Sequence, residues 1–357
     1  MEFKRIIIVA PGSSGGGTEV SAVKLGHYLK FIGVDVVFLD ASKLLGKKSY
    51  GKDCVCLKIY LYLKKIFYLR RVFQEFNPCV VISLLINTNL LTLSAGVGLS
   101  LPVIISERSF PGARDYGLVV SALRFFLYRS ASALVVQTSS SADWFMQKGW
   151  ERSRVFVIPN SVEFAEGDPE HKEFFGATHF QLYSLCRLIP SKRVEFLIFA
   201  MKELALVRHD WHFTIFGEGP CLSSLQELVK SLGLSEKISF AGWCGDKSLV
   251  STPMDVFMSA SVVEGFPNSL LEAMSYGHVC MHSRCQAGPS DVITSEDIGI
   301  LMDIDASCFD WAKKLDELLN HREDLKKISI NAISRAKDYS DKNILKLWIE
   351  PIMQVLE

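Results

Sequence analysis

The order of short apolar runs and helical stretches along the chain is the feature that most constrains its fold. Each run is rich in Val, Ile and Phe and is bounded by Gly, Pro or polar residues. Such runs are typical of strands that are buried on both faces of a parallel sheet. We predict strands at 6–10, 34–39, 80–84, 103–106, 133–137, 155–158, 180–184, 212–216, 238–241, 256–259, 279–282 and 300–302. Their alternation with helices predicts a doubly wound α/β fold.

The length of the chain predicts two such domains. A chain of 357 residues is too long for one typical core and suits two domains of roughly 150–200 residues each. The predicted strands divide equally about the segment 159–163, which is followed by a polar, turn-rich stretch. We therefore place the domains at 1–163 and 164–339, each a Rossmann-like sheet with its own helices.

The formal net charge is zero, yet the two halves differ in sign. Residues 1–163 hold 20 Lys and Arg against 11 Asp and Glu, a net of +9, and the rest of the chain carries −9. The first half therefore suits an anionic surface. Without an RNA-binding motif beside this charge, we expect no nucleic-acid partner.

The cysteines and the apolar segments predict a cytoplasmic protein. There are nine cysteines, an odd number, and the chain enters its first strand where a signal peptide would lie, which indicates a reducing compartment. The best transmembrane candidate, 90–105, is interrupted by Gly96 and Pro102 and is shorter than the ~20 residues that a span needs. We interpret it as a buried helix followed by a strand.

A basic, aromatic segment at 58–73 predicts an amphipathic helix. At about 100° per residue its apolar stripe and most of its cations fall on opposite sides. The stripe comprises Ile59, Tyr62, Leu63, Ile66, Leu69 and Phe73, and the cations are Lys58, Lys64, Lys65, Arg70 and Arg71. Such a helix can lie in the headgroup layer of an inner membrane. The alternative is a helix that packs on the core and keeps its cations in solvent.

Two glutamates flank a predicted helix start in the segment 264–275. Glu264 stands in a Gly-Phe-Pro turn after a strand, and Glu272 lies in the helix that follows. We expect Asn268 or Ser269 to cap this helix, so that its first N–H groups can hold a phosphate. Carboxylates beside a phosphate seat suit the hydroxyls of a sugar and a ribose. A capped surface helix with two solvated acids is the alternative.

A glycine-rich loop follows the first strand and opens a helix. Gly15, Gly16 and Gly17 allow a close approach of the backbone to a phosphate. The spacing is not that of a dinucleotide site, because position 14 is Ser. Asp40 ends the second strand and can mimic a ribose-binding acid, so an NAD-dependent dehydrogenase is an alternative on this motif alone.

Cations and further glycines follow the strands of the second half. Arg187 and Lys192 lie beyond the strand 180–184, at the sheet edge where α/β proteins bind ligands. Arg187 can hold a diphosphate bidentately, and Lys192 can supply a point charge. Trp243, after the strand 238–241, suits either stacking on a nucleotide base or packing in the core.

On the first half, Glu107 and Arg108 end the strand 103–106. Glu107 can orient or deprotonate an acceptor hydroxyl and Arg108 can meet a phosphate, whereas a structural role at the domain edge is the alternative for both. Two other patterns suggest metal sites and are discounted. His278, Cys280 and His282 alternate along a buried strand without a standard zinc spacing, and the Asp-x-Asp at 303–305 is interpreted as a turn.

Taken together, these motifs resemble the retaining glycosyltransferases of family 4, which have the GT-B fold. The double-glutamate segment, the Gly-Gly-Gly-Thr-Glu run, the Arg-Leu-x-x-x-Lys element and the Gly-Pro-x-Asp turn at 288–291 occur in the family order over residues 5–350. The sequence departs from the family pattern at four points. Cys186 and Arg193 stand at glycine positions, Asp291 stands at a glutamate position, and no His occurs near 105–110.

The resemblance implies two Rossmann-like domains that face a cleft. The domain 1–163, joined by a returning C-terminal helix at 340–357, would bind the acceptor, and 164–339 would bind the donor. Glu264 would contact the donor sugar and Glu272 the ribose, while Arg187 and Lys192 hold the diphosphate. The donor-binding residues implied are Gly15, Gly16, Gly17, Gly217, Glu218, Gly219, Trp243, Phe266, Pro267, Asn268, Ser269, Leu270 and Glu272.

The implied activity is transfer of a hexose or N-acetylhexosamine from a UDP-sugar to a lipid-linked saccharide. The resemblance places this step in bacterial O-antigen or capsule synthesis, on the cytoplasmic face of the inner membrane. No metal or other cofactor is expected, because Arg187, Lys192 and helix dipoles replace Mg²⁺. The alternatives are a nucleotide-sugar epimerase of the same architecture and a non-catalytic sugar-nucleotide-binding subunit.

Overall fold

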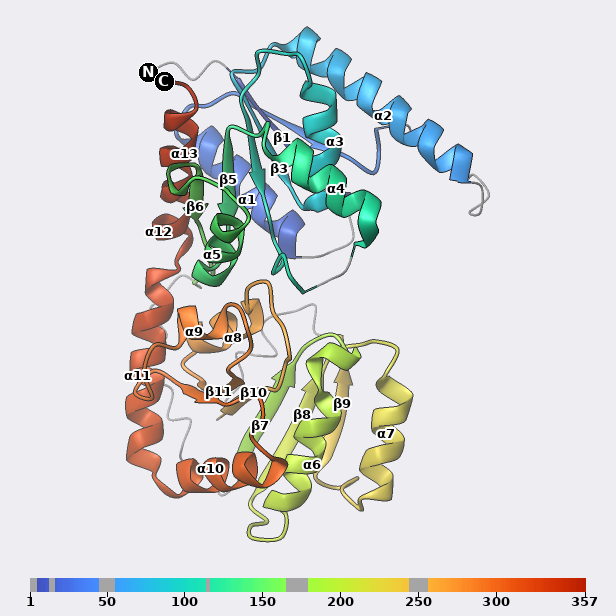
Figure 1. The fold of residues 1–357 in the computed structure, drawn as a ribbon. Coiled ribbons are helices and arrows are strands. Elements are labelled where there is room, and N and C mark those ends of the chain that lie inside the picture. The colour runs from blue at the N-terminus through green and yellow to red at the C-terminus, as the bar shows by residue number, and fades with distance from the viewer. Residues whose placement is uncertain (1–4, 13–16, 45–54, 114–115, 165–178, 244–255) are drawn as a thin grey trace. The chain divides into compact units, whose positions relative to one another are not determined.

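The computed structural model describes residues 5–12, 17–44, 55–113, 116–164, 179–243 and 256–357, with the side chains of 55–58 left aside. The chain divides into two compact units (Figure 1). Unit 1 comprises Met1–Ser161 and Asp341–Glu357, and unit 2 comprises Val162–Ser340. Both crossings between the units leave from one place in unit 2, because Val162 forms a bridge with Ser340.

Unit 1 contains a six-stranded parallel sheet in the order β2-β1-β3-β4-β5-β6. The strands are β1 (Ile6–Ala10), β2 (Val36–Asp40), β3 (Val80–Leu84), β4 (Val103–Ser106), β5 (Ala133–Val136) and β6 (Val155–Val157). All residues of β1, β3, β4 and β5 are buried, as expected when helices cover both faces of a sheet.

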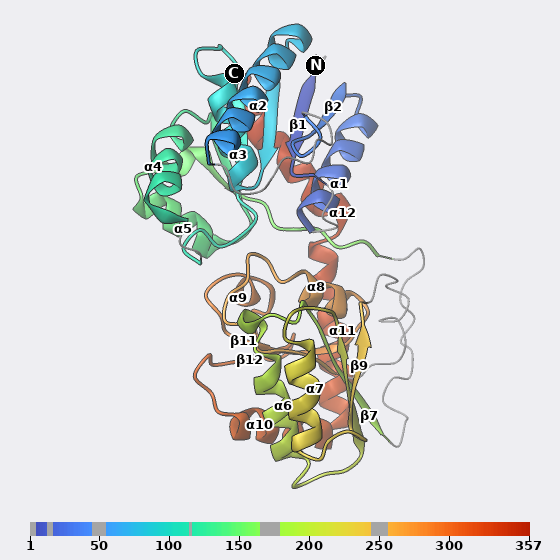
Figure 2. The same cartoon turned by 90° about the vertical axis from the view of Figure 1, so that its right-hand side faces the viewer.

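The chain direction decides which face each helix of unit 1 covers. Its helices are α1 (Gly17–Phe31), α2 (Val55–Phe76), α3 (Ile86–Gly96), α4 (Gly117–Tyr128) and α5 (Ser139–Gln147). The path from β1 to β2 runs opposite to the later steps across the sheet. Right-handed crossovers therefore place α1 on one face and α2, α3 and α4 on the other, as Figure 1 and Figure 2 show.

The end of the chain packs on unit 1. Helices α12 (Asp341–Leu345) and α13 (Ile349–Gln354), with the 3-10 turn between them, bury Ile344, Trp348 and Ile352 there. Lys24 of α1 donates to Asp341 at 2.9 Å, and Gln354 donates to the Ser153 carbonyl at 2.9 Å.

Unit 2 repeats the architecture with the strand order β12-β11-β10-β7-β8-β9. The strands are β7 (Phe180–Leu185), β8 (Trp211–Phe216), β9 (Ile238–Gly242), β10 (Val256–Ser259), β11 (Val279–Ser283) and β12 (Ile300–Met302). The helices are α6 (Val194–Leu204), α7 (Leu222–Ser231), α8 (Asn268–Ser275), α9 (Pro289–Val292), α10 (Cys308–Asn320) and α11 (Arg322–Asp338). The prediction of two doubly wound parallel sheets is confirmed.

Helix α2 combines the two interpretations of the segment 58–73. Leu69 and Phe73 of the predicted stripe are buried in the core of unit 1, whereas Ile59 and Leu63 are exposed. The C-terminal half of the stripe therefore packs in the core, as the alternative expected, and membrane contact by the exposed N-terminal half stays a prediction. Within the described parts of the chain, no helix combines the length and the apolar character needed to cross a bilayer.

Candidate active site

The second sheet has a topological switch point between β7 and β10. These strands are paired neighbours, yet the chain leaves β7 toward β9 through α6 and leaves β10 toward β12 through α8. Ligands of open α/β sheets bind outside the carboxyl ends of the strands at such a point. Lys192 follows β7 and Glu264 follows β10, so two predicted site residues flank this position.

The structure joins these two residues in an ion pair. The Lys192 Nζ lies 2.6 Å from the Glu264 Oε1, and the side chains are only 16% and 12% exposed. A charge-assisted hydrogen bond with so little solvent fixes both groups. Lys192 is the residue expected to bind the diphosphate, and Glu264 is the one expected to bind the donor sugar. Their direct contact means that these two expected binding positions are adjacent.

Two thiols and an imidazole surround the Lys192–Glu264 pair. Burial raises the pKa of the Cys186 thiol, and burial with the Glu264 charge raises the pKa of Cys285 to about 11. Burial lowers the pKa of His282, whose Nδ1 lies 2.8 Å from the Ser283 carbonyl oxygen. Both thiols and the imidazole are therefore neutral near pH 7. Within this group of side chains, only Lys192 and Glu264 carry charge.

The Lys192 backbone ends a short 3-10 turn that needs a left-handed residue next. Arg193 has φ 49° and ψ 42° and precedes α6, a conformation that glycine adopts without strain. This explains the glycine in the family pattern at this position. The Arg193 side chain is held by the Ile304 carbonyl at 3.2 Å and by the Phe196 ring.

Gly217 and Gly219 are required by the packing of two neighbouring loops, and their predicted contact with the donor stays a prediction. A Cβ at Gly217 would lie 1.8 Å from the Cys186 carbonyl oxygen, and one at Gly219 would lie 2.3 Å from that of Leu188. Leu188 N–H also donates to the Glu218 carbonyl at 2.8 Å. The glycines therefore let the loop after β8 pack on the loop that carries Arg187, and the space beside them is filled by protein backbone.

The turn before α8 is packed against the core of unit 2 through Phe266 and Pro267. The Phe266 ring is buried and lies 5.9 Å from the Tyr339 ring. Gly288, with φ 95°, faces Pro267 so closely that a Cβ would be 2.5 Å from its Cδ. Phe266 thus supports the turn from the core, and the buried Leu270 has only its backbone N–H to offer a ligand.

The start of α8 lies one or two residues earlier than predicted. The N-cap is Pro267, whose side chain makes no capping hydrogen bond. Neither Asn268 nor Ser269 is therefore the cap, because both already lie inside the helix. The first N–H groups of α8 carry partial positive charge, which suits an anion.

The other predicted donor residues lie in partly open positions. Arg187 is exposed after β7, and Glu272 is half-buried in α8. Trp243 is 62% exposed after β9, so it does not pack in the core. Gly15 and Gly16 lie outside the described residues, and Gly17 begins α1. Asp40 accepts hydrogen bonds from Ser42 N–H and Oγ at 2.8 and 2.6 Å, which closes a turn.

Glu107 in unit 1 belongs to a buried network. Its Oε1 accepts from the Tyr128 hydroxyl and lies 3.2 Å from the Arg124 guanidinium. Asn89 donates to the same hydroxyl at 3.1 Å, and Ser83 donates to Asn89 at 2.8 Å. Burial raises the pKa of the Glu107 carboxyl, although Arg124 and Tyr128 hold it down in part. These contacts favour the structural alternative for Glu107.

Arg108 is a half-buried cation that has no carboxylate partner among the described residues. Burial lowers its pKa to about 10, its terminal nitrogen donates to Asn160, and its Nε has no partner there. A buried charge without a counter-charge is costly in the free protein. Arg108 is therefore suited to bind an anion such as a phosphate.

Gln137 is a polar residue that the sequence analysis did not single out. It follows β5, is buried, and both polar atoms of its amide lack a partner in the described parts of the chain. It lies at the same carboxyl edge as Arg108. The available signal was a long polar side chain directly after a buried strand, a position we had assigned to the strand itself.

The alternate residues of β11 form no metal site. His278 Nδ1 lies 2.7 Å from the Tyr183 hydroxyl, and Cys280 is buried beside the Leu270 and His278 carbonyls. In the described segments, no three His, Cys, Asp or Glu side chains gather so as to hold a metal ion.

Acidification is expected to destabilise unit 2 through its buried histidines. Burial lowers the pKa of His278 to about 3, whereas an unfolded histidine titrates near ~6.5. Between these pH values only the unfolded state binds the proton. The free energy of unfolding therefore decreases as the pH is lowered, by up to about 1.4 kcal/mol per pH unit for each such histidine. Urea unfolding at pH 7 and 5.5 checks this. His278→Gln should weaken the dependence, and exposed His321→Gln should not.

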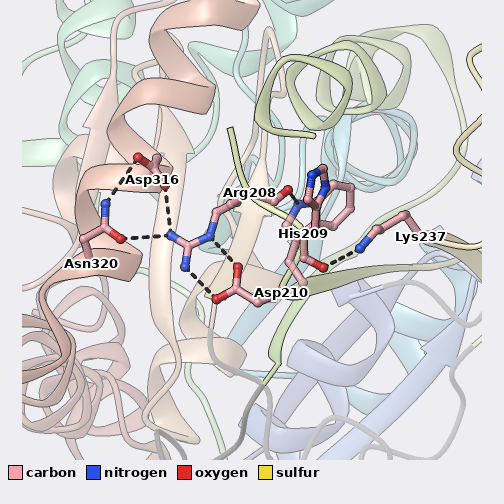
Figure 3. Close-up of polar contacts among 7 residues, drawn as sticks. Arg208, His209, Asp210, Lys237, Asp316 and Asn320 are labelled. Atoms are coloured by element: carbon pink, nitrogen blue, oxygen red, sulfur yellow. Dashed lines mark hydrogen bonds and ion pairs between the residues drawn. The ribbon is translucent and has the colours of Figure 1, made fainter. Parts of the chain in front are cut away.

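A hollow of about 560 Å³ lies at the opposite, amino edge of the second sheet, lined in part by Phe180, Arg208 and Arg322. Its central charge is already matched (Figure 3). The Arg208 guanidinium contacts Asp210 at 2.7 and 2.8 Å and Asp316 at 2.9 Å. This network joins the start of β8 to α10, so we interpret it as structural.

Comparisons with known proteins agree with this architecture. The model of a glycosyl transferase 4-like domain matches residues 16–161, and that of glycosyl transferases group 1 matches residues 169–335. The WaaB lipopolysaccharide outer core galactosyltransferase superposes with a TM-score of 0.76 at 18% identity, over 98% of this chain and 99% of its own. Anabaena HepE in complex with UDP gives 0.77 at 16%, over 97% and 98%. The fold is thus that of the GT-B glycosyltransferases.

Sequence relatives identify the family. A Campylobacter jejuni alpha-1,4-N-acetyl-D-galactosaminyltransferase, named for a GalNAc-GalNAc-diNAcBac-PP-undecaprenol substrate, is 30% identical over 98% of this chain and 99% of its own. An Escherichia coli lipopolysaccharide 1,6-galactosyltransferase is 24% identical over 64% of this chain and 63% of its own. The chain belongs to the group 1 glycosyltransferases, of the family 4 type, and is a transferase enzyme.

Proposed function

We propose that this enzyme transfers a sugar, with retention of configuration, from a UDP-sugar to a lipid-linked saccharide in bacterial surface glycan synthesis. The observation that carries the proposal is the buried Lys192–Glu264 pair at the switch point of the second sheet. Family membership favours a transferase over the epimerase and the non-catalytic subunit. Membership alone leaves the donor and the acceptor open.

The donor site uses the carboxyl edge of the second sheet. Lys192, Arg187 and the first N–H groups of α8 bind the diphosphate. Glu264 accepts from a sugar hydroxyl, Glu272 accepts from the ribose, and Trp243 stacks on the uracil. UDP in the HepE complex supports this nucleotide. An N-acetylhexosamine is favoured by the Campylobacter relative, and a hexose is the second choice.

In the transfer itself, the bond from the anomeric carbon to the diphosphate breaks as the acceptor oxygen bonds to the same face. The acceptor proton passes to the leaving phosphate oxygen, so no enzyme nucleophile is needed. The charge that develops on the diphosphate is met by Lys192, Arg187 and the helix dipole of α8, and no metal ion takes part.

The acceptor site lies at the carboxyl edge of the first sheet. Arg108 binds the phosphate of a lipid-linked saccharide, since its half-buried charge faces no carboxylate among the residues that the structure describes. The name of the Campylobacter relative contains such a lipid diphosphate, which supports this class of acceptor. The exposed half of α2 holds the enzyme at the cytoplasmic face of the inner membrane.

Hydrolysis of donor sugars in the absence of acceptor tests the proposal. We expect one UDP-sugar of a panel of UDP-hexoses and UDP-N-acetylhexosamines to release UDP, with the same rate in excess EDTA. The matched control is the corresponding panel of GDP- and ADP-sugars. Release of UDP from none of the sugars, or a free epimerised nucleotide-sugar as product, would contradict the assignment.

A further inference from the structure

Helix α4 has an inner and an outer face of different character. On the inner face Arg124 and Tyr128 are buried and bonded to Glu107. On the outer face Leu118 is 91%, Val119 74% and Phe126 69% exposed. Contiguous exposed apolar surface of this kind marks an interaction site in a soluble domain.

The described charges in α4 and directly after it are positive. Helix α4 contains no carboxylate, and the guanidinium of Arg129, just beyond it, lies 4.0 Å from the Phe125 ring centre. Helix α2 has its only acid, Glu75, in its last turn. A partner for this surface is therefore apolar with negative charge at its border.

The outer face of α4 and the exposed half of α2 lie on the same side of unit 1, with α3 between the two helices. Both helices pack against α3, on the same face of the first sheet (Figures 1 and 2). The N-terminal half of α2 exposes Ile59, Tyr60, Tyr62, Leu63, Phe67 and Tyr68. Aromatic and aliphatic side chains beside cations are the composition of helices that lie in a headgroup layer.

We propose that the outer face of α4 is a second lipid-contacting surface, which inserts into an anionic bilayer beside α2. The proposal rests on the proposed function, because the acceptor is lipid-linked. A second copy of the chain is a poorer occupant. The helix has 12 residues and is about 18 Å long, so one face of it buries far less than the ~800 Å² per partner of a stable dimer.

The two faces of α4 couple the membrane to the acceptor site. Glu107 is held by Arg124 and Tyr128 from the inner face, and Arg108 follows it directly. When the outer face rests on a bilayer, the loop after β4 therefore lies about one helix diameter, roughly 10 Å, from the lipid. We expect the phosphate of a lipid-linked saccharide to bind at this depth.

Flotation with vesicles of equal amounts of phosphatidylglycerol and phosphatidylcholine tests the proposal. The variant Leu118→Gln/Val119→Gln/Phe126→Gln is expected to lower the partition coefficient of the full chain by about tenfold or more. The matched control, Phe31→Gln/Leu206→Gln/Phe309→Gln, removes side chains that are also exposed but lie outside α2 and α4. It should bind within about twofold of wild type.

Two outcomes would overturn the proposal. Equal vesicle binding by the α4 variant and wild type would show that α4 does not contact lipid. Dimers of wild type in sedimentation, absent in the variant, would assign the face to a second copy. Hydrolysis of UDP-sugars without lipid should be unchanged in the variant. If wild type hydrolyses none, the proposed function fails, while the vesicle result still decides the role of α4.

Discussion

Replacing Glu264 by glutamine is expected to lower the turnover of sugar transfer by about 10²- to 10³-fold while the fold persists. The carboxylate lies 2.6 Å from the Lys192 ammonium and is 12% exposed, so little water can take its place. Glutamine keeps the shape and one acceptor oxygen but removes the charge. Lys192 then loses its fixed position, and the sugar hydroxyl loses an ionic acceptor.

The effect is measured as kcat and KM for the donor that the hydrolysis panel identifies. The matched control is Glu296→Gln, which removes an exposed acid paired with Lys314 and should leave both constants unchanged. Lys192→Met combined with Glu264→Gln should cost about as much as either change alone, because the two groups act as one unit. A Glu264→Gln enzyme within about tenfold of wild type would instead make the pair structural.

The strands of both sheets could be predicted from the sequence because their cause is local. A strand buried between two helical layers must be apolar at every position, and polar or Gly residues mark its ends. Strands β1, β3, β4, β10 and β12 have the predicted bounds, and the remaining ends differ by one or two residues. The expected division at 163/164 and 339/340 compares with 161/162 and 340/341 in the structure.

The contact between Lys192 and Glu264 could not be derived in the same way. The residues are 72 apart in sequence, and they meet because β10 pairs with β7 after the chain has passed through β8 and β9. Strand order is a property of the whole sheet, which no local pattern encodes. The resemblance to the family placed both residues near the diphosphate, but it did not predict their ion pair.

Gly217, Gly219 and helix α2 show that a correctly recognised sequence pattern does not by itself identify what its residues contact. Gly217 and Gly219 match a ligand-loop pattern, yet their missing side chains make room for backbone carbonyls. In α2 the apolar stripe continues along the whole helix, but the sheet beneath it covers only the second half. Periodicity identifies the apolar side of a helix, and only the neighbouring elements decide what covers it.

Glu107→Ala is expected to lower the free energy of unfolding by about 3–5 kcal/mol. The carboxylate is 2% exposed and is the charged partner of Arg124, whose guanidinium is itself enclosed by the rings of Tyr128, Trp144 and Phe145. Its removal leaves a cation buried without a counter-charge. The double variant Glu107→Ala/Arg124→Met should lose less free energy of unfolding than Glu107→Ala alone, because it has no unpaired buried cation.

A double-mutant cycle in urea separates the structural role of Glu107 from a catalytic one. If the network is structural, Glu107→Gln/Arg124→Met should recover at least about half of the loss caused by Glu107→Gln alone. Turnover of the folded Glu107→Gln enzyme at low temperature should then stay within about tenfold of wild type, whereas loss of a general base costs about 10²- to 10⁴-fold.

An unchanged unfolding midpoint together with a collapse of turnover would instead identify Glu107 as the general base of the acceptor site. The same result would remove the link between α4 and the acceptor loop, because that link consists of the Glu107 contacts to Arg124 and Tyr128.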